Sequence, residues 1–316
     1  MAINTLAMAT KMTEALDKAI VQNAVTGVFA DGTMKAQFIG AKTVKIPSLN
    51  MDGLGNYDRD NGFVGGALSV TQETFTLTMD RGRTFQLDRE DNDEVAVGDL
   101  AGQMMGEFVR TQVVPEVDAY ALSKLAAMAV TKSHTVTVGS GSTLAADAYK
   151  MWQSALLGVQ QATGFNGEQL LAFVDPTFWA ALNNSSAVSR QIVVSDFAKG
   201  GVTTQVKKLD NVVLLPVDPA RMKTAYTFYD GETDTSATDG GTNQKAGGFV
   251  ATSSAKSVGL LLCSRKVGEL VKKTEKMRIF APDQNQKADA YKFDYRLYYD
   301  FLIRKNRANQ VYAYTY

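Results

Sequence analysis

The segment from Met51 to Asp88 constrains the fold more than any other part of the chain. Its first part is a polar run with five glycines between residues 53 and 66, and it includes the pair Asn61-Gly62. An Asn-Gly pair between extended, alternating stretches is a strong signal for a tight hairpin. An extended reach of this length needs a surface to lie on, and the flanking sequence offers none. We therefore expect an arm that packs on a neighbouring subunit.

A strict alternation of side chains starts at Phe75 and predicts one long strand up to Asp88. One face is apolar except for two arginines beside Gly82. Either Gly82 marks a turn, or the row emerges from one hydrophobic contact and meets acidic groups before it enters another. The second explanation suits an arm that leaves its own core. The residues of this face are Phe75, Leu77, Met79, Arg81, Arg83, Phe85 and Leu87.

Composition and charge narrow the class of protein. The chain has 316 residues, of which 45% are hydrophobic and 21% charged, which is ordinary for a soluble protein with a substantial core. Its 33 basic residues balance its 33 acidic residues, whereas a protein that condenses nucleic acid by itself carries a basic excess. No stretch approaches the roughly 20 apolar residues of a membrane span, and no secretory signal opens the chain. A nucleic-acid-binding module on the N-terminal lysines stays as a weak alternative.

The pattern of the remaining chain is mixed α and β. Residues 95–129 predict a long helix that Pro115 should kink. Gly98, Gly102 and Gly106 lie on one stripe of this helix and predict a groove where another backbone lies close. Pro47 should end a short strand that begins at Thr43. The other expected elements are helices at 12–24, 145–162 and 176–182, strands at 43–46, 131–138, 170–174, 212–217 and 295–303, and a polar loop at 230–248.

The chain offers no recognisable catalytic motif. His134 is the only histidine and Cys263 the only cysteine, which we expect to be buried. Neither a nucleophile elbow nor a phosphate-binding loop is present. The acidic run from Asp88 to Glu94 fails the calcium-loop template, and its carboxylates suit the start of a helix better. We therefore expect no enzyme, no cofactor and no metal, with a metal-dependent hydrolase at Asp88–Glu94 as the rival reading.

Four longer stretches of the chain carry a resemblance to a known family: NMDGLGNYDRDNGFVGG, TLTMDRGRTFQLDREDNDE, EFVRTQVVPEVDAYALSKLA and DAYKFDYRLYYDFLIRKNRANQVYAY. The chain resembles major capsid proteins of tailed bacteriophages and prophages, which share the Johnson fold, also called the Hong Kong 97-type fold. The resemblance is strongest across residues 50–130 and 280–316 and weakest from 185 to 250.

The resemblance implies an α+β fold with a particular division of the chain. The expected parts are an N-terminal arm at 1–42, an extended loop at 43–90, a peripheral domain with a spine helix at 91–139, an axial domain at 140–255, and a C-terminal return to the peripheral domain at 256–316.

The resemblance also implies a function and partners. The chain would assemble through hexamers and pentamers into an icosahedral shell around double-stranded DNA, without sequence-specific contacts and without a membrane. It would lie in the virion after assembly in the cytoplasm of the host bacterium. Because the sequence starts directly at the arm, we expect a separate scaffolding protein or assembly by the shell protein alone; portal and decoration proteins are further partners. The alternative is an encapsulin-like cage that encloses cargo proteins.

The expected interface lies on the extended loop and its flank. Since no lysine occurs from Pro47 to Ser123, a covalent isopeptide link through this loop is not supported. Apolar side chains would instead lie on the neighbour, and arginines would pair with carboxylates across the seam, because a guanidinium makes bidentate contacts. The expected interface residues are Tyr57, Arg59, Phe75, Leu77, Met79, Arg81, Arg83 and Asp88.

Overall fold

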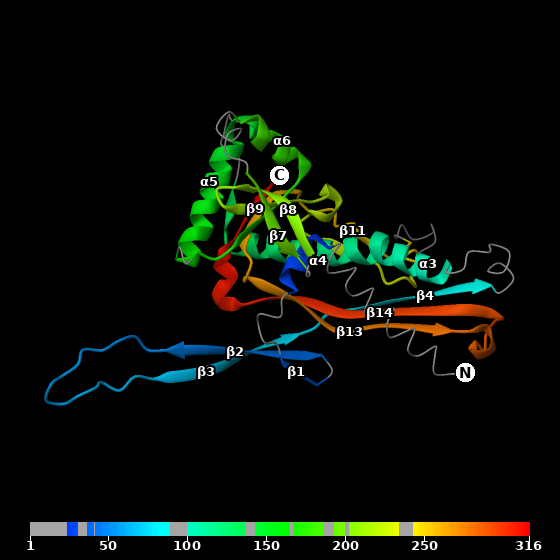
Figure 1. Cartoon of the computed structure of the whole chain (residues 1–316), viewed down its shortest axis with the longest axis horizontal. Coiled ribbons are helices and arrows are strands. Elements are labelled where there is room, and N and C mark those ends of the chain that lie inside the picture. The colour runs from blue at the N-terminus through cyan, green and yellow to red at the C-terminus, as the bar shows by residue number, and fades with distance from the viewer. Residues whose placement is uncertain are drawn as a thin grey trace.

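The chain folds into a mixed α and β body from which one hairpin projects (Figure 1). The computed structural model describes residues 24–30, 37–40, 42–88, 100–136, 143–164, 167–185, 193–199, 202–233 and 243–316. The strands of these residues form four sheets, with the orders β1-β2-β3, β10-β11, β5-β15-β12-β6-β9-β8-β7 and β13-β14-β4.

The projecting element is the hairpin arm, residues 43–76. Its strands β2 (Thr43–Met51) and β3 (Leu68–Thr76) are antiparallel, and β1 (Gln37–Ile39) pairs with β2 at the root of the arm only. The prediction that Pro47 ends a strand is wrong, because β2 continues through it. Pro47 lies past the end of β1, on an edge of the sheet where proline is tolerated.

The strand β4 (Met79–Asp88) follows the arm closely but belongs to a different sheet. It pairs with β14 (Ala290–Ile303), which in turn pairs with β13 (Gly268–Phe280). These three strands form the long sheet, which lies beneath α3 and α4 in Figure 1. The expected single strand from residue 75 to 88 is therefore wrong, since the chain changes sheets at residues 77–78.

Gly82 does not mark a turn. It lies within β4, opposite Arg296 of β14. A Cβ atom at this position would stand 2.9 Å from the carbonyl oxygen of Tyr295. Close approach of two backbones explains this glycine, as is common for glycine inside a strand.

The expected long helix is present as three consecutive segments. They are α3 (Leu100–Phe108), a π-helical turn η2 (Val109–Val113) and α4 (Val114–Thr131). The π turn ends two residues before Pro115, in the region where the missing N–H of the proline interrupts the helical hydrogen bonds, and the kink itself stays a prediction. Nothing lies within 4 Å of a Cβ built on Gly106, so the glycine groove stays a prediction. Residues 95–99 lie outside the described residues.

The seven-stranded sheet separates two hydrophobic cores. Side chains of β6 alternate between them: Phe173 packs with α4 and the long sheet, whereas Val174 packs with α5 and α6. Cys263 of β12 is buried as expected. Because β12 and β15 belong to this sheet, the expected boundary at residue 255 divides one sheet.

The remaining elements have the following bounds. The helices are α5 (Leu144–Thr163) and α6 (Pro176–Asn184). The strands are β5 (Thr135–Val136), β6 (Leu170–Val174), β7 (Val193–Lys199), β8 (Val202–Leu209), β9 (Val212–Pro216), β10 (Tyr226–Phe228), β11 (Phe249–Ala251), β12 (Val258–Ser264) and β15 (Val311–Thr315). Short 3-10 turns are η1 (Val25–Phe29), η3 (Pro219–Arg221), η4 (Pro282–Gln284) and η5 (Lys305–Gln310).

The turn η1 ties the N-terminal part of the chain into the core. Phe29 is buried between Phe173 and Phe301, with ring centroids 6.0 and 5.3 Å away. The buried carboxylate of Asp118 on α4 accepts hydrogen bonds from the backbone N–H of Thr26 at 2.9 Å and from its hydroxyl at 2.7 Å. The expected N-terminal arm at 1–42 therefore includes a segment of the core; the helix expected near residues 12–24 lies almost wholly outside the described residues.

Candidate assembly surface

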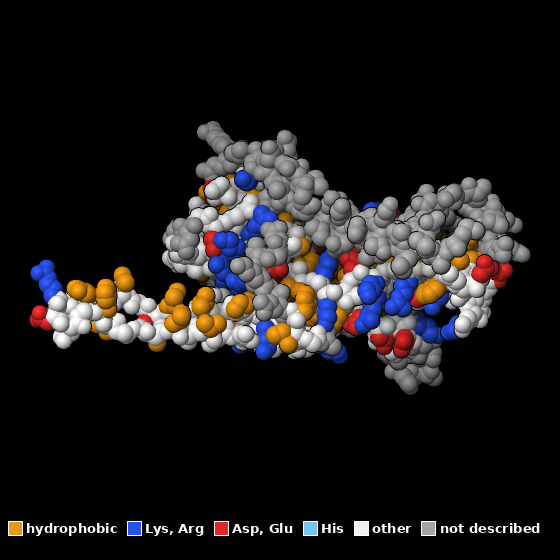
Figure 2. Space-filling model, turned by 60° about the horizontal axis from the view of Figure 1, so that its bottom comes forward, with side chains coloured by type: hydrophobic (Ala, Val, Ile, Leu, Met, Phe, Trp, Pro, Cys, Tyr) orange, Lys and Arg blue, Asp and Glu red, His pale blue; other side chains and the backbone are white. Residues whose placement is uncertain are grey.

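An apolar ladder lies exposed on the distal half of the hairpin arm. Leu49 faces Val70 across the two strands, and Met51 faces Leu68. Alternation along each strand places these four side chains on one face, where each is 60–69% exposed. Figure 2 shows apolar side chains gathered along the arm. A contiguous exposed apolar surface of this kind marks a site of interaction.

The root of the arm is buried on the opposite face. Val44 and Ile46 of β2 pack against Val271, Tyr298 and Leu302 of the long sheet, with Phe75 of β3 beside them. Val44 and Ile46 are out of phase with Leu49 and Met51, so the apolar side changes face near Pro47. The arm is thus held to its own body by one face and presents its apolar residues on the other.

The tip of the arm, residues 57–63, is a closed turn. The N–H of Gly62 donates to the Asp58 carbonyl oxygen at 2.8 Å, and the Asn61 side chain donates to the Asp58 carboxylate at 2.7 Å. The Asn61 hydrogen bond is the main reason that the pKa of Asp58 is lowered. Gly62 has a φ of +83° and pairs with Asp58, so the chain reverses here as predicted, but Asn61-Gly62 ends a longer turn rather than forming its centre. Tyr57 and Phe63 meet edge to face with ring centroids 5.0 Å apart.

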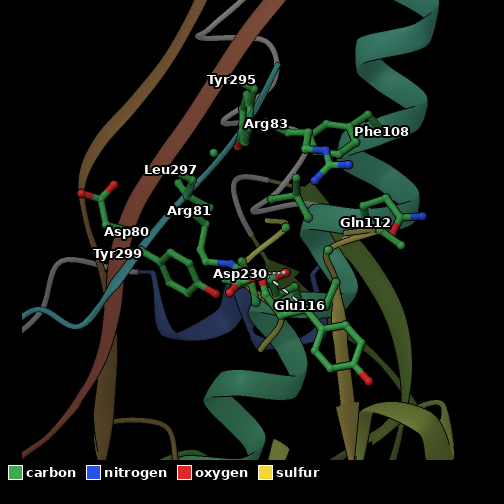
Figure 3. A pocket seen from close by; sticks show the side chains of 18 of the residues that line it. Asp80, Arg81, Arg83, Phe108, Gln112, Glu116, Asp230, Tyr295, Leu297 and Tyr299 are labelled. Atoms are coloured by element: carbon green, nitrogen blue, oxygen red, sulfur yellow. Dashed lines mark hydrogen bonds and ion pairs between the residues drawn. The ribbon is translucent and has the colours of Figure 1, made fainter. Parts of the chain in front are cut away.

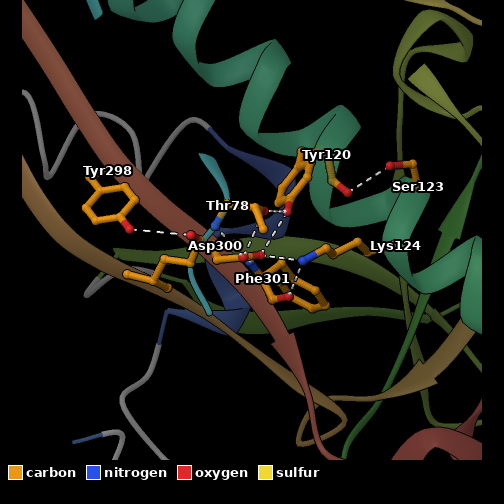
Figure 4. Close-up of polar contacts among 8 residues, drawn as sticks. Thr78, Tyr120, Ser123, Lys124, Tyr298, Asp300 and Phe301 are labelled. Carbon is orange, nitrogen blue, oxygen red and sulfur yellow. Dashed lines mark hydrogen bonds and ion pairs between the residues drawn. The ribbon is translucent and has the colours of Figure 1, made fainter. Parts of the chain in front are cut away.

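A part-buried polar network fixes the point where the arm joins the body (Figure 4). The carboxylate of Asp300 on β14 accepts hydrogen bonds from the backbone N–H and the hydroxyl of Thr78, each at 3.1 Å. It also accepts from the Tyr120 hydroxyl at 2.9 Å and forms an ion pair with Lys124, both on α4. Thr78 lies between β3 and β4, so this network, named here the root network, links the arm to the helix and to the long sheet.

The root network contains a charged pair that is largely removed from water. The Asp300 side chain is 2% exposed and that of Lys124 is 35% exposed. Burial alone would lower the pKa of Lys124, but the hydrogen bonds to Asp300 and Tyr120 outweigh burial and raise it. Lys124 therefore carries its charge at neutral pH, and the network depends on the Asp300 carboxylate to balance it.

Apart from Arg81 and Arg83, the expected interface residues fall into an exposed group and an apolar group that packs on the chain's own body. Tyr57, Arg59 and Asp88 are exposed, the first two at the tip and the third at the end of β4. Leu77 and Met79 are buried in the chain's own cores, and Phe75 is half-buried at the root. The expectation that these side chains cover a neighbour is corrected for Leu77 and Met79 by their burial, and for the half-buried Phe75 it stays a prediction. The sequence reasoning missed the apolar ladder, although the alternation that identifies it is visible on both sides of the glycine-rich run.

Arg81 and Arg83 of β4, both expected at a subunit interface, point into the chain's own body rather than toward a neighbouring subunit. Arg81 forms an ion pair with Glu116 of α4 through Nε at 2.7 Å and Nη2 at 3.1 Å. Its Nη1 donates to the Tyr229 carbonyl oxygen at 2.6 Å. Arg83 donates to the Lys245 carbonyl oxygen at 3.0 Å. The strand alternation places both guanidinium groups on the face of β4 that packs on α4, which corrects the expected pairing of these two arginines with a neighbour (Figure 3).

The side chain of His134 packs against another ring of the fold. Its ring stacks on Tyr312 at a centroid distance of 4.4 Å, and Nδ1 lies 3.2 Å from the Val311 carbonyl oxygen. In the described part of the chain, no group of three or more His, Cys, Asp or Glu side chains could hold a metal ion, and no helix has the length and apolar character of a membrane span. Of the acidic run at 88–94, only Asp88 lies within the described residues.

Comparison with known proteins places this architecture among phage capsids. No family model and no curated protein matches the sequence. A solved capsid structure of the cyanophage P-SCSP1u is 14% identical with a TM-score of 0.54, and the match covers 88% of this chain and 84% of that chain. The mature capsid of bacteriophage PhiM1 is 10% identical with a TM-score of 0.54, over 87% and 82% of the two chains. A chain of Mycobacterium phage Che8 is 13% identical with a TM-score of 0.50, over 88% and 91%.

These likenesses extend over nearly the whole chain at low sequence identity, and what they show is the fold. The mixed α and β architecture expected from the sequence is confirmed by the helices and sheets described above. The chain has the Hong Kong 97-type fold of phage capsid proteins.

Proposed function

We propose that this chain is the major capsid protein of a tailed bacteriophage, which assembles with copies of itself into an icosahedral shell around double-stranded DNA. Hexamers and pentamers are the intermediates of this assembly. The protein then lies in the virion, and it assembles in the cytoplasm of the host bacterium. It treats the chain as a structural protein rather than an enzyme. Its support is the fold together with the apolar ladder.

The apolar ladder is the observation that carries the proposal. Four apolar side chains on a projecting ribbon, with no cover among the described residues, are unfavourable for a protein that stays alone. Burying a side chain of this size against a neighbour contributes about 1–2 kcal/mol when it starts two-thirds exposed. One arm then contributes a modest contact, and many identical contacts in a closed shell make a stable particle.

A pair of substitutions tests the role of the ladder. Leu49→Ser with Val70→Ser removes one cross-strand pair of the ladder, and we expect soluble subunits but no closed shells in electron micrographs. Ser69→Ala lies on the opposite face of the same ribbon and should assemble normally. Circular dichroism of both proteins checks that the body still folds. Normal shells from the double variant would refute the role of the ladder in assembly, and shells that carry protein cargo in place of DNA in their natural host would refute the viral function.

A further inference from the structure

A cluster of basic side chains, named here the basic corner, lies where the turn between β12 and β13 meets the residues that follow β14. The backbone N–H of Arg304 donates to the Val267 carbonyl oxygen at 3.4 Å and joins these two segments. Figure 2 shows basic side chains gathered at the end of the body from which the arm projects. Like charges this close repel one another unless carboxylates balance them. The basic corner consists of Arg265, Lys266, Arg304, Lys305 and Arg307.

The carboxylates that contact the basic corner do not balance its charge. Glu168 is shared by two of the five cations, at N–O distances of 2.9 and 3.8 Å. Glu73 of β3 accepts from the backbone N–H of Lys305 at 3.4 Å. Within the described part of the chain, the side chains of Arg304 and Lys305 form no ion pair. Five cations thus meet two carboxylates, and Lys266 and Lys305 are exposed to solvent.

The densest group of opposite charges in the sequence is the segment from Asp88 to Glu94, named here the acidic run. Five of its seven residues are Asp or Glu, and one is Arg. Asp88 is exposed at the end of β4, and the residues that follow it lie outside the described ones. The basic corner and the acidic run are therefore complementary in charge.

The acidic run cannot reach the basic corner of its own chain. Asp88 pairs with Ala290 at the start of β14, whereas Arg304 follows the other end of that strand. The 14 positions from residue 290 to residue 304 span roughly 45 Å of strand, but the six positions from Asp88 to Glu94 span at most about 22 Å when fully extended. Figure 1 shows β4 ending at the end of the body opposite to the arm. Contact between these two charged segments therefore requires a second copy of the chain.

We propose that the acidic run of one copy docks on the basic corner of a neighbouring copy. This inference rests on the proposed function, because it adds a second contact between copies to the one that the apolar ladder makes. The two partners lie at opposite ends of the chain, so the contact is head-to-tail and its repetition can close a ring. Double-stranded DNA is a poorer occupant, because affinity for DNA grows with the number of phosphates neutralised and a chain without net charge offers only this small patch.

Charge reversal in two separate variants of the full chain tests the docking. The corner variant carries Lys266→Glu and Lys305→Glu, and the acidic-run variant carries Glu90→Lys, Asp91→Lys and Asp93→Lys. In either variant alone the contact joins like charges, so the chain concentration for half-maximal assembly, measured by sedimentation velocity, should rise by about tenfold or more. An equimolar mixture brings opposite charges together wherever the two variants alternate, and it should assemble close to the concentration of the unmodified chain. These differences should shrink between about 0.05 M and about 0.5 M salt.

Lys256→Glu with Lys276→Glu is the matched control, because it makes the same change of charge at two exposed lysines outside the basic corner. This control should assemble as the unmodified chain does, and melting temperatures check that all variants fold.

Three outcomes would overturn the docking. If the mixture assembles no better than its components while the unmodified chain forms closed shells, the docking fails and the proposed function stands. If the corner variant also loses salt-dependent binding to random-sequence duplex DNA that the unmodified chain shows, the basic corner serves DNA instead. Absence of shells from the unmodified chain would refute the proposed function, and the docking with it.

Discussion

Replacing Asp300 with asparagine should destabilise the chain by about 2–4 kcal/mol, because the root network has no other acceptor of equal capacity. The Oδ2 atom accepts from the N–H and the hydroxyl of Thr78, and Oδ1 accepts from Tyr120, Lys124 and the N–H of Phe301. An asparagine that keeps its oxygen toward Lys124 turns its NH₂ group toward the N–H of Thr78. An unsatisfied buried donor costs about 1–3 kcal/mol. Loss of the charge opposite Lys124, discounted because that side chain is one-third exposed, adds about 1 kcal/mol.

Urea unfolding of the unassembled chain at neutral pH measures this change. Asp294→Asn is the matched control, because it makes the same substitution on the same strand. Asp294 is 29% exposed and pairs with Lys292 at 3.4 Å, so its replacement should cost less than about 0.5 kcal/mol. A difference of less than about 1 kcal/mol between the two variants would refute the importance assigned to the root network.

The same network predicts a dependence on alkaline pH. The hydrogen bonds to Asp300 and Tyr120 raise the folded-state pKa of Lys124 above its usual value near 10.5. Its contribution to stability is therefore complete below the unfolded-state pKa and disappears as pH rises through the folded-state value. We expect this part of the alkaline loss of stability to be absent from Asp300→Asn. An equal loss in both proteins between pH 10 and 12 would contradict the pairing of Lys124 with Asp300.

Three further substitutions or reagents probe other parts of the body. Gly82→Ala should lower the unfolding free energy by about 1–3 kcal/mol in the same urea assay, since its Cβ would meet the Tyr295 carbonyl oxygen at 2.9 Å. Burial would raise the pKa of Glu168, but hydrogen bonds from Ser264 and Arg307 lower it. The contribution of Glu168 to the unfolding free energy should therefore be complete above its unfolded-state pKa near 4.5 and be lost as pH falls through the folded-state value. Glu168→Gln should make the unfolding free energy less dependent on acid pH. Burial also raises the pKa of the Cys263 thiol, and a thiol reagent should label it only after unfolding, whereas fast labelling of the folded chain would contradict its place in the core.

Local sequence patterns were sufficient to predict a helix or strand where one of its faces packs against one hydrophobic core. The strand expected at 170–174 has those bounds in β6, and the helix expected at 145–162 is α5 with one residue more at each end. Asp175 caps α6, with its carboxylate accepting from the N–H of Phe178 at 2.7 Å. In these cases the residues that decide the structure are neighbours along the chain, so periodicity and capping signals report it.

Local patterns failed where partners are distant in the sequence. Thr78 and Asp300 are separated by 222 positions, and nothing near Thr78 indicates that the chain changes sheets there. Arg81 interrupts an apolar row in the sequence, but its partner Glu116 lies 35 positions away on a helix. An inward-facing arginine therefore looked like an interface residue. The prediction that Pro47 ends a strand fails because the position of Pro47 on the edge of the sheet depends on where β1 ends, which no local pattern specifies.

The change of apolar face along the arm limits how subunits can meet. If two arms paired ladder to ladder, the contact would be two-fold and would saturate in a dimer. If each ladder instead covers a different surface of the next subunit, the contact is head-to-tail and generates a ring or an open chain, depending on the rotation between subunits. The buried face at the root fixes the direction in which the arm leaves the long sheet, so this rotation depends on Val44, Ile46 and the root network as much as on the ladder. Residues that never touch a neighbour would then decide whether the proposed rings close, because they set the angle at which the ladder is presented.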